Sequence, residues 1–267
     1  MYWCTAYLHD LDIQVFLSLS IFGATLFIYN YHRLFRKKVI YAKEISERHQ
    51  WILAHDRLLQ VFAVAGFLLA AGCFIPYLNP TLFFRLSPFL LLSLFYVIPV
   101  WKGKKKWLRV RDIPFMKIFL VAAVWSFVTV FLAFLAEDPF WFPDIDAWLT
   151  TLQRFIFIFA ITLPFDIRDL AHDRSSGLTT FAARLGVEGV KRLANILLVV
   201  VAALAGISTF IGIYSLPHGI GVSISCALTG FLISRIDEDS SEWIYAGFLD
   251  GTMLDQFLWI SLLAYFF

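Results

Sequence analysis

The chain has 267 residues, of which 60% are hydrophobic, 18% aromatic and only 16% charged. No soluble core of this size needs so much apolar residue, so the composition excludes an ordinary soluble globular protein. The formal net charge of +2 does not identify a partner by itself. The sequence contains no phosphate-binding Walker loop and no dinucleotide-binding fingerprint. We also expect no nucleic-acid partner.

Apolar segments that approach or reach the length of a membrane span follow one another along the chain. Their approximate limits are 11–31, 51–76, 82–101, 113–136, 147–165, 193–214, 219–233 and 243–267. No Gly/Ser-rich or Pro-rich linker and no short-period repeat separates them, so we expect a single domain over residues 1–267. The sequence thus predicts an all-α fold, a polytopic transmembrane bundle of about eight spanning helices.

Lysine and arginine are concentrated in alternate connections between these segments. Nearly all of them lie in the connections that follow the first, third, fifth and seventh segments. Basic connections remain on the cytoplasmic side of a membrane, so these four should be cytoplasmic and the N-terminus should lie outside. The ends of several predicted helices then meet at one cytoplasmic face, where a site could form between them.

The longest polar passage after the first apolar segments follows the fifth one. It carries Asp166, Asp169 and Asp173, a spacing that places the three carboxylates on one face of a helix. Two or three convergent carboxylates are what Mg²⁺ needs when it also binds a phosphate ligand. Arg168 and Arg174 alternate with the acids, so a solvated loop of mixed charge is the competing interpretation.

The stretch 166–173, followed by Arg174, Gly177, Thr179 and Gly186, resembles the second aspartate-rich motif of the UbiA-type intramembrane prenyltransferases. Two looser elements agree with this resemblance. Tyr96 and Lys102 close the third segment in a wider version of that family's Tyr-x-x-x-Lys element. The last segment begins with the stretch 248–251, Phe-Leu-Asp-Gly.

The resemblance implies a UbiA-like bundle of nine helices around a cavity, in which two aspartate-rich motifs hold Mg²⁺ and an isoprenyl diphosphate. The implied activity is transfer of the isoprenyl group to an apolar acceptor, a membrane lipid or a quinone-like molecule, at the cytoplasmic side. The implied catalytic metal ligands are Asp166, Asp169 and Asp173. The implied contacts to the diphosphate are Asn30, Arg33, Lys102 and Arg174.

The first motif of that family, Asn-Asp-x-x-Asp-x-x-x-Asp, has no equivalent set of acids here. Aligned on Asn30, its three aspartates become Tyr31, Leu34 and Lys38. Basic groups of this helix end could replace a metal, because arginine and lysine bind phosphates directly. We expect Arg33 or Arg36 to point toward the aspartates in that case.

Two other functions remain open. The chain could be a non-catalytic UbiA-like protein that binds a lipid or a partner. It could also be a small-solute transporter that uses Asp250 and Asp255, two carboxylates inside the last apolar segment. Inverted repeats would favour the transporter, and the sequence has none that we detect.

The beginning of the chain departs from a nine-helix pattern. Residues 2–8 are too few to span a bilayer, yet they resemble the tail of an apolar segment. The helix that ends at Asn30 corresponds to the second helix of the family. We therefore expect an N-terminally shortened version of a nine-helix protein, with its first helix missing or truncated and a gap beside the cavity.

Overall fold

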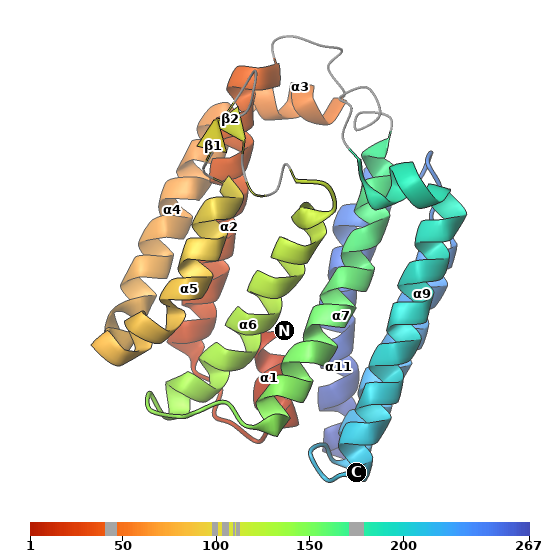
Figure 1. Cartoon of the computed structure of the whole chain (residues 1–267). Helices are drawn as coiled ribbons and strands as arrows, with labels where there is room; N and C mark the ends of the chain where they lie inside the picture. The colour runs from red at the N-terminus through yellow and green to blue at the C-terminus, as the bar shows by residue number, and fades with distance from the viewer. Residues whose placement is uncertain (41–46, 98–100, 103–106, 109, 111–112, 171–178) are drawn as a thin grey trace. The chain divides into compact units, whose positions relative to one another are not determined.

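The structure is a computed structural model that describes residues 1–40, 47–97, 101–102, 107–108, 110, 113–170 and 179–267. Helices make up nearly all of the described chain, as the composition predicts (Figure 1). The elements are α1 (Tyr2–Leu8), α2 (Val15–Ile40), α3 (Glu47–Ala54), α4 (Asp56–Phe74), η1 (Ile75–Tyr77), α5 (Pro80–Val97), β1 (Trp101–Lys102), β2 (Trp107–Leu108), α6 (Met116–Glu137), α7 (Ile145–Arg168), α9 (Phe181–Phe210), α10 (Leu216–Ser234), η3 (Ile244–Leu249) and α11 (Asp250–Phe266).

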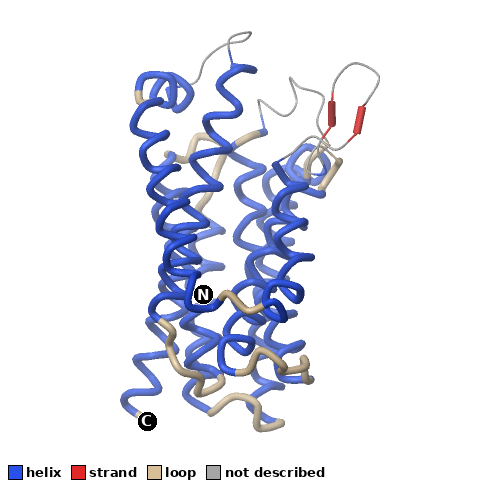
Figure 2. The backbone as a smooth tube through the Cα atoms, turned by 90° about the vertical axis from the view of Figure 1, so that its left-hand side faces the viewer, coloured by secondary structure: helices blue, strands red, loops and turns tan. Residues whose placement is uncertain are grey.

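The only strands among the described residues are β1 and β2, which pair antiparallel with Trp101 opposite Leu108 (Figure 2). Each strand has two residues. Because the strands are so short, the fold is still all-α, as the sequence predicts.

Contacts divide the chain into two compact units. The larger unit comprises Met1–Asp12 and Phe84–Phe267, and the smaller unit is Ile13–Phe83. The sequence offers no composition change at either boundary, and the prediction of one domain over residues 1–267 stays a prediction.

Five helices of the described chain are long and apolar enough to cross a membrane. Their limits are Asp56–Tyr77, Met116–Glu137, Ile145–Arg168, Phe181–Phe210 and Leu216–Ser234. Two shorter apolar stretches, Val15–Tyr31 within α2 and Pro80–Ser93 within α5, are further apolar helical segments of the described chain. The chain is an integral membrane protein by these helices, while the expected number of eight spans stays a prediction.

Helix limits differ most from the sequence prediction on either side of the aspartates. α7 contains Pro164 and does not end with the apolar run at residue 165. It continues to Arg168. α9 begins at Phe181, well before the predicted residue 193, and Gly186 breaks its helical geometry with a φ of 72°. Hydropathy marks only the apolar part of a helix, so it misses polar turns that lie at the ends.

The larger unit has a continuous apolar core formed by α6, α7, α9, α10 and α11. Its most buried members include Phe157 of α7, Leu198 of α9 and Ile260 of α11. Cys4 and Cys226 are buried in the same core.

α1 packs against α6 and α11. Residues 2–8 thus form a short helix, and the prediction of a missing helix before α2 stays a prediction.

The smaller unit is organised by a close approach of α2 and α4. A Cβ atom added to Gly23 would lie 2.7 Å from the backbone oxygen of Gly66 and from the backbone nitrogen of Ala70. A Cβ added to Gly66 would lie 2.8 Å from the backbone oxygen of Gly23. Ser20 donates a hydrogen bond of 2.9 Å to the carbonyl oxygen of Ala70. Small residues at helix interfaces allow this backbone contact in membrane proteins.

We predict that Gly23→Ala and Gly66→Ala each destabilise the protein by about 1–3 kcal/mol, because the two helix backbones must move apart. Gly72→Ala is the matched control, since it lies in the same helix as Gly66 and its Cβ would meet nothing within 4 Å. The free energy of unfolding in detergent measures the effect. Equal stability of Gly23→Ala and Gly72→Ala would contradict the contact.

His9 fixes the end of α1 to the core of the larger unit. Its Nε2 atom is 2.8 Å from Oγ1 of Thr150, and its ring packs edge-on against Phe134 at 4.9 Å between ring centres. Burial lowers the pKa of His9 from 6.5 to about 4, although the charge of Asp144 acts in the opposite direction. The folded protein therefore holds His9 neutral down to a lower pH than the unfolded chain does.

We predict that this contribution to stability is complete above about pH 6.5 and is lost as the pH falls to about 4. In that interval the unfolded chain binds a proton that the folded protein does not, and the limit of the effect is about 3 kcal/mol. Thermal unfolding across this interval should depend less on pH in His9→Gln than in the wild type. Identical pH profiles would show that His9 is not held neutral by the fold.

Candidate functional site

The end of α7 positions the first two aspartates of the predicted motif. The helix begins at Asp144, whose carboxylate accepts a hydrogen bond of 2.9 Å from the backbone N–H of Ala147. It ends at Arg168, so Asp166 lies in the last turn and Asp169 is the C-terminal cap. The two carboxylates are three positions apart, which brings them to neighbouring positions on one helix face.

Asp166 is buried, with only 2% of its surface exposed. Its Oδ2 atom accepts a hydrogen bond of 3.2 Å from the backbone N–H of Phe181, the first residue of α9. Its Oδ1 atom lies 3.7 Å from Nζ of Lys117. A helix N-terminus and an ammonium group both stabilise a carboxylate, so Asp166 has two sources of compensation for its burial.

Asp169 faces the same lysine. Its Oδ2 atom is 3.3 Å from Nζ of Lys117, and its Oδ1 atom is 2.9 Å from Nε of Arg168. One oxygen of Asp166 and one of Asp169 therefore converge on a single positive charge. Lys117 lies in the first turn of α6, and 38% of its side chain is exposed.

Arg168 connects this carboxylate pair to the start of the last helical segment. Its NH1 atom is 3.4 Å from an oxygen of Glu242. Its guanidinium lies over the rings of Phe165 and Tyr245, at 4.9 Å and 5.6 Å from the ring centres. The larger unit thus brings together Lys117, Asp166, Arg168 and Asp169, a cluster that we call the aspartate cluster.

The other predicted site residues are placed as follows. Asp173 and Arg174 lie outside the described residues, and Lys102 is described by its backbone in β1. Asn30 is buried in the smaller unit and donates a hydrogen bond of 2.7 Å to the carbonyl oxygen of Leu26, one turn earlier. Arg33 lies over the ring of Tyr29 in the same helix, at 4.1 Å from the ring centre. Their roles toward a diphosphate stay predictions, as does the orientation of Arg36.

Lys117 is the residue that sequence reasoning missed. The positive-inside pattern treats it as one more basic residue of a cytoplasmic connection. A lysine inside the predicted segment 113–136 is nevertheless an intramembrane charge, and such a charge requires a partner. That signal could have identified Lys117, although the sequence alone does not name Asp166 and Asp169 as its partners.

Asp250 and Asp255 do not form a pair. Asp255 accepts hydrogen bonds of 2.8 Å from the hydroxyl of Ser225 and 3.0 Å from the indole N–H of Trp259. Asp250 is exposed in the first turn of α11. Since the two carboxylates have separate surroundings, a coupling pair for solute transport gains no support.

The described residues contain no group of three or more His, Cys, Asp or Glu side chains placed to hold a metal ion. The aspartate cluster contributes two carboxylates from its described part, Asp166 and Asp169. A third ligand from the predicted motif would be Asp173.

The fold and this cluster define a helical integral membrane protein with paired aspartates at the end of a spanning helix. The sequence model of the UbiA prenyltransferase family matches residues 45–260, which is most of the chain. The chain therefore belongs to the UbiA prenyltransferase family. A sequence comparison with the curated proteins gives no match.

Two solved structures share the fold. Both are of a UbiA homologue from Archaeoglobus fulgidus, one bound to GPP and Mg²⁺ and the other to DMAPP and Mg²⁺. The first has a TM-score of 0.63 with 13% identity, over 99% of this chain and 95% of that chain. The second has a TM-score of 0.62 with 13% identity, over 99% of this chain and 94% of that chain. These structures confirm the UbiA-like fold that the aspartate motif predicts.

Proposed function

We propose that this chain transfers an isoprenyl group from an isoprenyl diphosphate to an apolar acceptor in the membrane, a lipid or a quinone-like molecule. The observation that carries the proposal is the convergence of Asp166 and Asp169 on one cation in the last turn of a membrane helix. Membership of a prenyltransferase family supports the reaction type. The positive-inside pattern supports a cytoplasmic location for the reaction.

The carboxylates fit a divalent cation. Asp166 Oδ1 and Asp169 Oδ2 already face one positive charge, and carboxylate oxygens are the ligands that Mg²⁺ prefers. We propose Asp166, Asp169 and Asp173 as its ligands, and the Archaeoglobus homologue bound to Mg²⁺ with either GPP or DMAPP supports Mg²⁺ as the ion. Bound Mg²⁺ would supply positive charge that stabilises the departing diphosphate.

The reaction requires the bond between C1 of the isoprenyl group and the diphosphate oxygen to break, with the electron pair leaving on the diphosphate. The acceptor then forms a bond to C1 and releases a proton. Lys117 and Arg168 are the described cations nearest to the carboxylates, and either can donate hydrogen bonds to the diphosphate. The roles of Asn30, Arg33, Lys102 and Arg174 as further diphosphate contacts rest on the family resemblance.

A second candidate function is binding of an isoprenyl lipid without transfer. Two observations favour it. The first aspartate-rich motif lacks its three acids, and the described acids of the second motif are already compensated by Lys117 and Arg168. A protein of this kind would retain the apolar interior of the bundle and lose the chemistry at its end.

We predict that the purified protein binds a non-hydrolysable isoprenyl diphosphate analogue in the presence of Mg²⁺ and at least ten-fold more weakly without it. Asp166→Asn and Asp169→Asn should each weaken the Mg²⁺-dependent binding by a similar factor, since each removes one metal ligand. Isothermal titration calorimetry in detergent measures these affinities.

Asp239→Asn is the control for that titration, because Asp239 is an exposed carboxylate on the loop after α10. Mg²⁺-independent binding in the wild type would exclude the metal site. Mg²⁺-dependent binding without transfer to any acceptor in native membrane extract would favour the second candidate function.

We also predict that Lys117→Met increases the affinity for Mn²⁺, measured by electron paramagnetic resonance in the absence of diphosphate, several-fold. The ammonium of Lys117 lies between the two oxygens that a metal would bind, so the lysine and the metal compete. Arg235→Gln, which removes an exposed charge elsewhere, should leave the affinity unchanged. Weaker Mn²⁺ binding in Lys117→Met would show that the lysine supports the metal site instead.

A further inference from the structure

Arg154 is a buried cation in the interior of the larger unit. It lies in the first half of α7, a helix apolar enough to span a membrane, and only 4% of its surface is exposed. An arginine in this environment carries a high cost unless a negative charge compensates it. The groups around Arg154 therefore decide how its charge is stabilised.

The described contacts of Arg154 are to neutral groups. Its guanidinium donates to Sδ of Met1 and, at 3.4 Å, to Oγ1 of Thr5, both in the N-terminal segment. No carboxylate of the described chain lies within 4 Å of it. These neutral acceptors satisfy part of its hydrogen-bonding capacity but bring no negative charge into contact with the guanidinium.

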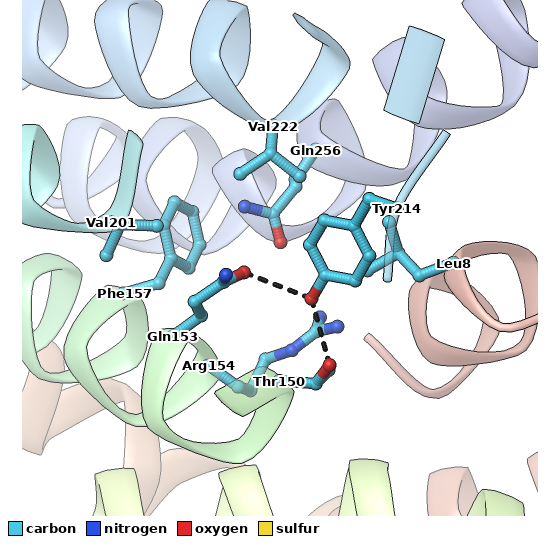
Figure 3. A pocket seen from close by; sticks show the side chains of 9 residues that line it. All are labelled: Leu8, Thr150, Gln153, Arg154, Phe157, Val201, Tyr214, Val222 and Gln256. Atoms are coloured by element: carbon cyan, nitrogen blue, oxygen red, sulfur yellow. Dashed lines mark hydrogen bonds between the residues drawn. The ribbon is translucent and has the colours of Figure 1, made fainter. Parts of the chain in front are cut away.

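A small cavity lies beside Arg154 and is lined by polar side chains (Figure 3). Three of them form a hydrogen-bonded chain. Tyr214 contacts Oγ1 of Thr150 at 2.9 Å and donates to Oε1 of Gln153 at 3.0 Å. The Nε2 atom of Gln153 donates a further hydrogen bond of 2.9 Å to Oγ of Ser208. The cavity wall is therefore ordered by its own hydrogen bonds.

Gln256 of α11 closes the cavity, and its amide makes no hydrogen bond to another group of the described chain. The residue is 4% exposed. Figure 3 shows the amide oxygen of Gln256 directed toward Gln153 and Tyr214 and its nitrogen directed toward Phe157. The amide of Gln256 and the guanidinium of Arg154 therefore line the same cavity.

We propose that this cavity is a binding site for a small monovalent anion of the size of chloride. Arg154 supplies the positive charge, and the amide of Gln256, which makes no hydrogen bond within the described chain, can rotate to donate an N–H to the anion. The cavity leaves about 10 Å³ for the centre of a water-sized sphere, which is room for one small particle. A water molecule would satisfy Gln256 but would not compensate the charge of Arg154, so the charge favours the anion.

The anion site is separate from the aspartate cluster. Arg154 precedes Asp166 by twelve residues in α7, which corresponds to about 18 Å along the helix axis. A bound anion would connect α1, α7, α11 and the loop that carries Tyr214. The proposal therefore stands independently of the transfer reaction, and its expected effect is on the stability of the larger unit.

The test is the midpoint of thermal unfolding of the full-length protein in detergent, with chloride replacing gluconate at constant ionic strength. We expect the midpoint to rise with chloride and to saturate, because a ligand of the folded state stabilises it. Arg154→Gln and Gln256→Leu should each weaken the apparent chloride affinity at least ten-fold. Arg235→Gln, an exposed position, should retain the wild-type response.

Line broadening of the ³⁵Cl nuclear magnetic resonance signal gives a second measurement that does not depend on unfolding. The folded wild type should broaden it, and folded Gln256→Leu should broaden it less. A wild-type midpoint that does not change with the anion would show that the cavity holds water and would overturn the proposal. An equal chloride response in the wild type and in both cavity variants would also overturn it.

Discussion

A charge inside an apolar helical bundle must find compensation, and the aspartate cluster depends on this constraint. Asp166 is almost fully buried at the end of a helix that could span a membrane. Lys117 of α6 and the backbone N–H of Phe181 at the start of α9 both stabilise its charge. The compensation connects the ends of α6, α7 and α9, so the geometry of the cluster and the packing of these helices support each other. Loss of either partner would leave a buried carboxylate exposed to a low dielectric.

The sequence predicted the all-helical membrane fold and the neighbouring positions of Asp166 and Asp169, because both depend on local patterns, while the role of the aspartates stays a prediction. Apolar runs identify spanning helices, and a three-residue spacing places Asp166 and Asp169 side by side. The sequence did not predict Lys117 as their partner, because 52 residues separate it from Asp169 and many topologies could bring another lysine there. The early start of α9 at Phe181 was missed for a different reason. Its first turns carry charged residues among the apolar ones, and Gly186 interrupts them, so they do not belong to a continuous apolar run.

Lys191 in the same unit also lies between two carboxylates, but its partners are far more exposed than Asp166. Nζ of Lys191 lies 2.9 Å from Glu188 and 2.7 Å from Asp237, so this lysine also bridges two carboxylates. Both partners of Lys191 are largely exposed, at 81% and 72% of their side chains, and water can solvate them without the lysine. The side chain of Asp166 is 3% exposed and has no such alternative. A cation therefore stabilises the ionised aspartate cluster more than it stabilises the exposed partners of Lys191, and a metal ion could supply the same positive charge as the ammonium.

Arg154 completes this comparison of buried charges. Lys117 and Lys191 each have two carboxylate partners, whereas Arg154, which is more deeply buried than Lys117, has only a thioether and a hydroxyl among its described contacts. Within the described chain, Arg154 thus has no carboxylate partner of the kind that stabilises the two lysines. An arginine stays protonated in proteins, so it cannot avoid the cost by losing its charge, as a buried lysine can. The proposed anion would supply the negative charge that the described contacts of Arg154 lack, and the cavity that Arg154 and Gln256 line is where it can be accommodated.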